Sequence, residues 1–141
     1  MANTVMTSFK SELLSGVHDF ATAGDTFKLS LYTSSSTINN ASTTVYTTSD
    51  EVADSGSESA GGGSLANQAV STDGTTALVD FDDLSFTSAT ITARYALIYN
   101  STDSNKAVCV LDFGTDQTST SGTFTIQFPS AGASTAIIRV A

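Results

Sequence analysis

From residue 26 onward, apolar and polar side chains alternate along short runs, and this period of two limits the possible folds more than any other feature. The run "TFKLSLYT" places Phe27, Leu29 and Leu31 on one face, opposite polar residues, as in a half-buried strand. Clusters of Gly, Asp, Asn and Ser separate the runs. The sequence therefore predicts an all-β fold, an antiparallel β-sandwich (Ig-like or jelly-roll-like) that forms one domain over residues 1–141. Further strands are expected at 43–48, 76–81, 84–87, 89–100, 106–113, 122–128 and 135–140.

The segment "RYALIYNSTDSNKAVCVLDFG" at 94–114 contains the clearest hairpin. Its second strand, with "AVCVL", is apolar on both faces, so we expect a central strand that is covered on both sides. Cys109, the single cysteine, is then a small buried apolar residue. If residues 101–105 form the turn, Arg94 lies opposite Asp112 and the two can form an ion pair, whereas a register shifted by one residue separates them.

One helix is expected, in "TSFKSELLSGVHDF" near the N-terminus. Thr7 or Ser8 can cap its first turn, and we expect about three turns that end near residue 20. Two roles fit this helix: packing against its own domain, or docking on a neighbouring molecule as part of an arm formed by residues 1–20. For docking, the candidate interface residues are those of its apolar stripe, namely Phe9, Leu13, Leu14 and Val17.

The segment 53–63 combines acidic residues with a glycine triplet. Such a composition buries little apolar surface, so the sequence predicts a mobile acidic loop.

The charge balance limits the choice of partner. Five basic and fourteen acidic residues give a net charge of −9, and this surface would repel nucleic acids and anionic membranes. "MANTVMTSFK" lacks the pattern of a signal peptide, so we expect synthesis in a cytoplasm. Ser and Thr account for 45 of the 141 residues, a composition typical of extracellular or viral β-structures.

Candidates for chemistry are few. His18 is the only histidine and is expected at a surface or interface. Asp80, Asp82 and Asp83 in "DFDDL" are weak candidates for a Ca²⁺ site, against the alternative of a solvated turn between strands. Paired carboxylates also serve glycosidases, but the chain has no tryptophan on which a sugar could stack. We therefore expect no enzymatic activity, no catalytic residues and no cofactor.

Several motifs together resemble a family of small virion proteins of tailed bacteriophages: "TSFKSELLSGVHDF", "DTFKLSLYTS", "TARYALIYN…NKAVCVLDFG" and "GTFTIQFPSAGASTAIIRVA". The resemblance implies a β-sandwich component of the virion without enzymatic activity. Within that class we favour a capsid decoration (cement) protein that binds the major capsid protein as a homotrimer. Two alternatives are a tail-tip or fibre-adaptor module, and a Ca²⁺- or carbohydrate-binding module that attaches the virion to its host.

Overall fold

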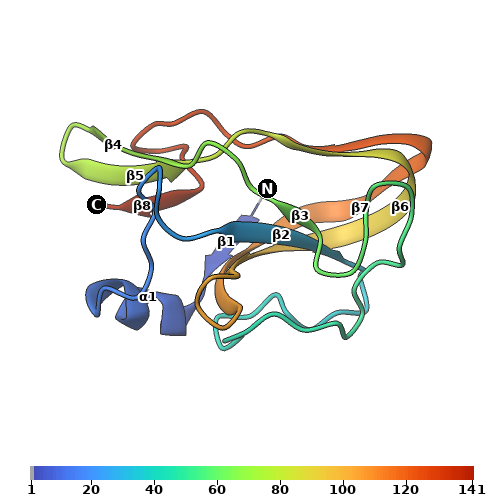
Figure 1. Ribbon diagram of the computed structural model, residues 1–141, viewed down its shortest axis with the longest axis horizontal. Helices are drawn as coiled ribbons and strands as arrows, with labels where there is room; N and C mark the ends of the chain where they lie inside the picture. The colour runs from blue at the N-terminus through green and yellow to red at the C-terminus, as the bar shows by residue number, and fades with distance from the viewer. Residues whose placement is uncertain (1) are drawn as a thin grey trace.

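The alternating runs form two antiparallel sheets in the computed structural model, which describes residues 2–141 (Figure 1). The elements are β1 (Ala2–Val5), α1 (Thr7–Leu14), β2 (Phe27–Tyr32), β3 (Gly63–Ser64), β4 (Ala69–Asp73), β5 (Thr76–Asp80), β6 (Leu84–Asn100), β7 (Lys106–Ile126) and β8 (Ile138–Val140). One sheet has the strand order β1-β7-β6-β2-β3 and the other the order β4-β5-β8. The predicted all-β, sandwich-like fold with one short N-terminal helix is confirmed.

The hairpin β6–β7 dominates the molecule and is longer than predicted. β6 unites two expected strands, and β7 continues through 114–121, where no strand was expected. The turn at 101–105 is as predicted. Midway, the pairing shifts from Tyr95↔Asp112 to Ala93↔Gln117, and both strands bend over at the right-hand end of Figure 1. Both strands stay in the larger sheet on either side of the bend, so this sheet folds over at its bulges.

Asp112 holds this bend together. Its Oδ1 accepts hydrogen bonds from Arg94 Nε at 3.3 Å and from the backbone N–H of Gly114 at 2.8 Å. The Gly114 N–H, followed by Arg94, lowers the pKa of the Asp112 carboxyl. Gly114 has φ +81°, a left-handed conformation that glycine adopts without steric cost. The ion pair between Arg94 and Asp112 forms as predicted, but the register is shifted by one residue and places Tyr95 opposite Asp112. The expectation that such a shift separates the two side chains is therefore wrong.

The core follows the central strand of the larger sheet. Residues 107–111 of β7 are completely buried between β1 and β6, so the prediction of a central strand covered on both faces is confirmed. Cys109 is among them and is buried, as expected. The core also contains a cluster of aromatic rings, in which Phe20 stacks on Phe27 of β2 with ring centroids 4.3 Å apart.

Three short strands carried no clear sequence signal, and one expected strand does not form. β1, β3 and β4 were not predicted; β4 is exposed along its whole length and so has no apolar alternation. Residues 43–48 make only one isolated bridge, Val45↔Lys106, instead of a strand. The C-terminal strand begins at Ile138, three residues later than expected.

Helix α1 is shorter than the sequence predicts. Its N-cap is Met6, without a side-chain cap from Thr7 or Ser8, and it ends at Leu14. Gly16 (φ +74°) ends it: the N–H of Gly16 donates to Leu13 O, and the N–H of Val17 donates to Glu12 O. This pair of bonds is a Schellman motif, which completes a helix at a left-handed glycine.

Residues 2–20 belong to the domain and do not form a separate arm. β1 pairs with β7 over Ala2↔Asp112 to Val5↔Cys109. Met6, Phe9 and Phe20 are buried in the core. Of the two roles expected for the helix, packing against its own domain is the one that the structure displays for Phe9.

The acidic segment 53–63 has little regular structure but is held by many hydrogen bonds. Ser57 Oγ accepts from the N–H of Thr87, and Ser55 Oγ accepts from the N–H of Thr90, both at 2.8 Å. Tyr99 Oη donates to Gly61 O at 2.7 Å. The expectation of a mobile loop does not fit these contacts, because polar groups rather than apolar burial fix the segment against β6.

Candidate functional site: an apolar groove beside helix α1

Exposed apolar side chains concentrate at one end of the molecule. Among the described residues, four large apolar side chains are strongly exposed: Leu14 at 91%, Val70 at 57%, Val140 at 53% and Val45 at 47%. The first three line two adjoining hollows, of about 570 and 440 Å³, between α1 and the sheet β4-β5-β8. We call these two hollows together the apolar groove. Side chains exposed singly are ordinary, but a contiguous apolar surface marks a binding surface.

One wall of the apolar groove is helix α1. Leu13 lies in both hollows, and Leu14 and Lys10 lie in the larger one. Because residues three and four apart share a helix face, the stripe predicted from sequence points in this direction. Of the four candidate interface residues, Leu13 and Leu14 are available to a partner. Phe9 is only 2% exposed and belongs mainly to the core, and Val17 lines neither hollow.

The opposite wall and the floor come from the smaller sheet. In the register of β5 and β8, Ala77 lies opposite Val140 and Val79 lies opposite Ile138. Side chains of residues two apart in a strand share a face, so these four side chains form one apolar surface. Val70, opposite Val79 on β4, extends it. Sequence periodicity alone does not reveal this wall, because it requires the pairing of residues 59 and 63 positions apart.

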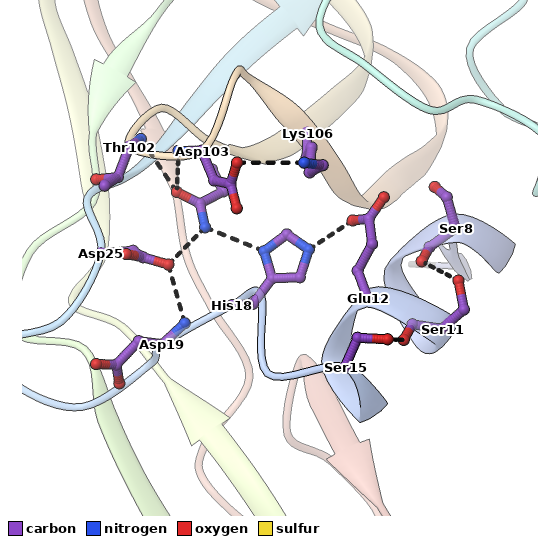
Figure 2. Close-up of polar contacts among 11 residues, drawn as sticks. Ser8, Ser11, Glu12, Ser15, His18, Asp19, Asp25, Thr102, Asp103 and Lys106 are labelled. Carbon is purple, nitrogen blue, oxygen red and sulfur yellow. Dashed lines mark hydrogen bonds and ion pairs between the residues drawn. The ribbon is translucent and has the colours of Figure 1, made fainter.

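His18 fixes the helix that forms the first wall. It is buried, and its ring lies between Glu12 of α1 and the turn that follows β6 (Figure 2). The Nε2 atom lies 2.7 Å from Glu12 Oε2, and Nδ1 lies 3.0 Å from Asn100 Nδ2. The expectation of a surface or interface histidine is wrong, because the chain leaves the helix before residue 18 and turns the imidazole inward.

The orientation of Asn100 determines the tautomer of His18. Asn100 Oδ1 accepts the N–H groups of Thr102 and Asp103, so its amide nitrogen faces the histidine and also donates to Asp25 Oδ2 at 2.7 Å. His18 Nδ1 is therefore an acceptor, and Nε2 carries the proton that it donates to Glu12. Both ring nitrogens are thus engaged within the protein, and the network ties α1 to the end of β6.

A second buried polar group lies in the segment 53–63. The side chain of Glu58 is buried at 1% exposure, and within the described part of the chain neither of its carboxyl oxygens has a hydrogen-bond partner. Burial, followed by the nearby charges of Glu51 and Asp54, raises the pKa of Glu58 to about 7. The neighbouring carboxylates are satisfied: Glu51 accepts from Tyr46 and Gly61, and Asp54 accepts from Ala60.

The three aspartates of "DFDDL" serve separate local contacts. Asp80 ends β5 opposite Ala69, Asp82 accepts from the side-chain amide of Asn67, and Asp83 accepts from the N–H of Phe128 at 2.8 Å. Over residues 2–141, no group of three or more His, Cys, Asp or Glu residues is arranged to hold a metal ion. The structure therefore does not assemble the weak Ca²⁺ candidate at this position.

Cys109 cannot readily ionise. Burial raises the pKa of its thiol to about 12, and it lies in the central strand β7.

In the described part of the chain, no helix is both long and apolar enough to cross a membrane. Comparison of the chain with protein-family models, with curated proteins and with solved structures gave no match.

Proposed function

We propose that this protein is a virion structural protein of a tailed bacteriophage, and specifically a decoration protein that binds the major capsid protein on the head shell. The observation that carries this proposal is the apolar groove, where three of the four strongly exposed large apolar side chains gather. The sequence resemblance described above supplies the class of partner. The proposed role is structural and requires neither a catalytic residue nor a cofactor.

The architecture suits such a role. A groove between a short helix and a small sheet is a limited contact surface, so a single copy would bind weakly. A shell lattice holds each attached molecule through several neighbours, and modest contacts then add through effective concentration. We propose that the protein binds as a symmetric homo-oligomer, a trimer, because closed symmetry presents several copies of the groove at once.

The first test is the number of copies in purified particles, measured by quantitative mass spectrometry against the major capsid protein. A decoration protein is expected in a fixed proportion to the capsid subunits. A small number per particle would contradict the proposal and assign the protein to the tail as a tip or fibre-adaptor module. Absence from particles would contradict any virion role.

The second test is binding to undecorated capsids. Leu14→Gln removes the most exposed apolar side chain of the groove but keeps good helix propensity, so the fold is expected to persist. We expect this variant to bind capsids at least about tenfold more weakly than the wild type. Val45→Thr is the matched control, because Val45 is also exposed but lies outside the groove. An equal loss of capsid affinity in both variants would argue against docking through the groove.

A further inference from the structure

The larger hollow of the apolar groove lies beside a strand edge without a neighbour. β8 pairs with β5 through Ala77↔Val140, Leu78↔Arg139 and Val79↔Ile138, and it is the outer strand of its sheet among the described residues. An outer strand presents unpaired N–H and C=O groups along its free edge, and another chain can pair with them. The hollow of about 570 Å³ is lined by β8 on one side and by α1 on the other.

The shape of this hollow matches one extended segment. Three residues of β8 span about 10 Å, since a strand rises about 3.3 Å per residue. A segment paired with β8 would point alternate side chains toward the apolar lining of the hollow, near Leu13 and Ile138. Leu14 and Val140 would cover it from the sides. Addition of a strand to a sheet edge is an established mode of peptide recognition, in which main-chain bonds give affinity and side-chain pockets give specificity.

The charge of the hollow is opposite to that of the whole chain. Only five basic residues offset fourteen acidic ones, and two of the five, Lys10 and Arg139, line this hollow. Arg94 and Lys106 are paired with aspartates, whereas Lys10 and Arg139 take part in no ion pair within residues 2–141. Arg139 donates to one backbone oxygen, that of Ala133, at 3.1 Å. The hollow therefore favours carboxylates in an otherwise acidic molecule.

We propose that the larger hollow binds an extended acidic segment of a partner protein, which adds as a strand to the free edge of β8. Apolar side chains of the segment pack on Leu13, Leu14 and Val140, and its carboxylates pair with Lys10 and Arg139. The inference rests on the proposed function for the identity of the partner, the shell protein. A second copy bound through the same hollow is disfavoured, because a two-fold contact would bring two Lys10–Arg139 pairs together.

The binding mode can be tested without capsids. The probe is an acetylated peptide of about six residues in which valine alternates with threonine and aspartate, and the control peptide has lysine in place of aspartate. In methyl and amide NMR spectra of the full chain, the aspartate peptide is expected to shift Leu13, Leu14 and Val140 and to slow amide exchange in β8. The lysine peptide is expected to bind at least about tenfold more weakly. Shifts without slower exchange in β8, or equal binding of both peptides, would overturn the proposal.

A charge-reversed variant is expected to gain binding of the lysine peptide, whereas a misfolded variant would only lose binding. In the double variant Lys10→Glu/Arg139→Glu, we expect the binding preference to change from the aspartate peptide to the lysine peptide. The circular dichroism spectrum should stay unchanged. Retained preference for the aspartate peptide would overturn the assignment of the two basic residues. Self-association of the wild type that the variant abolishes would assign the hollow to a second copy and equally overturn the proposal.

Capsid binding separates this inference from the proposed function. If the wild type and the charge-reversed variant bind capsids equally, the strand-addition inference fails while the decoration role stands. If the wild type ignores capsids but binds the aspartate peptide as described, the decoration role fails and the binding mode stands. We expect the wild type to bind and the variant to lose at least about tenfold in affinity.

Discussion

Glu58 is the residue whose burial is hardest to reconcile with its chemistry. Two acidic side chains close to it accept backbone N–H groups: Glu51 accepts from Gly61, and Asp54 accepts from Ala60. Glu58 has no such partner within residues 2–141, and an ionised carboxylate without partners is costly to bury. Its pKa of about 7, against an ordinary value of 4.5, means that the folded protein prefers the protonated form.

The pH dependence of stability follows from this shift. Because the folded-state pKa is raised, the stabilising contribution of Glu58 is complete below pH 4.5 and is lost as the pH rises through about 7. Between about pH 5 and about pH 8.5, we expect the free energy of unfolding to fall by up to about 3 kcal/mol through this group. Denaturant unfolding of the wild type and of Glu58→Gln at these two pH values measures the change in the free energy of unfolding.

In Glu58→Gln, we expect most of the fall in the free energy of unfolding with rising pH to disappear. At about pH 8.5, this variant should be more stable than the wild type. Asp116→Asn is the control, since it removes one negative charge from an exposed position of β7. If the wild type and Glu58→Gln show the same pH dependence, the burial of an unpartnered carboxyl group in the segment 53–63 is contradicted.

At the scale of elements, helix α1 has two faces with opposite roles. Phe9 is 2% exposed and contacts His18 with ring centroids 4.9 Å apart, whereas Leu14 is 91% exposed. We expect Phe9→Ala to lower the free energy of unfolding by about 3–5 kcal/mol, because it leaves a cavity in the core. Leu14→Ala, in the same helix, should change it by less than about 0.5 kcal/mol. Denaturant titrations of both variants measure these values, and similar effects would contradict the described packing of α1.

The elements that the sequence predicts well are those with a strong local pattern. The alternation of "TFKLSLYT" predicts β2, and the apolar run "AVCVL" predicts the first part of β7. β4, with the sequence "AVSTD", is exposed throughout, and β1 pairs with a strand more than 100 residues away, so neither leaves a local signal. Helix α1 was predicted too long, because the left-handed Gly16 ends the helix while the apolar spacing continues beyond it.

The candidate site was predictable in part for the same reason. Leu13 and Leu14 follow from the helical stripe, while the wall formed by Ile138 and Val140 appears only when β8 pairs with β5. His18 and Glu58 were not predicted as buried, because burial of a polar side chain depends on contacts distant in sequence. For His18, the only signal in the sequence is indirect: the acidic residue Glu12 stands six positions before it.

At the scale of the whole molecule, Cys109 reports on global unfolding. Its thiol is fully buried, its pKa is raised to about 12, and its strand lies between β1 and β6. We expect native-state thiol labelling to give an opening free energy within about 1 kcal/mol of the global unfolding free energy, since the central strand should open last. Thr118→Cys in a Cys109→Ala background is the control and should be labelled rapidly, because residue 118 is exposed. Rapid labelling of Cys109 itself would reveal local detachment of β1.

The continuous strands β6 and β7 also determine how the molecule responds to force. They run along its long axis, from the end where α1 and β8 lie to the bend at the opposite end (Figure 1). A pull along this axis loads the hydrogen bonds between β6 and β7 in shear, so many of them must break together. A force that lifts β8 from β5 meets only three paired residues, which can separate one bond at a time. We therefore expect the short pairing of β8 with β5, at the strand edge where we place the partner, to separate under tension before the β6–β7 hairpin does.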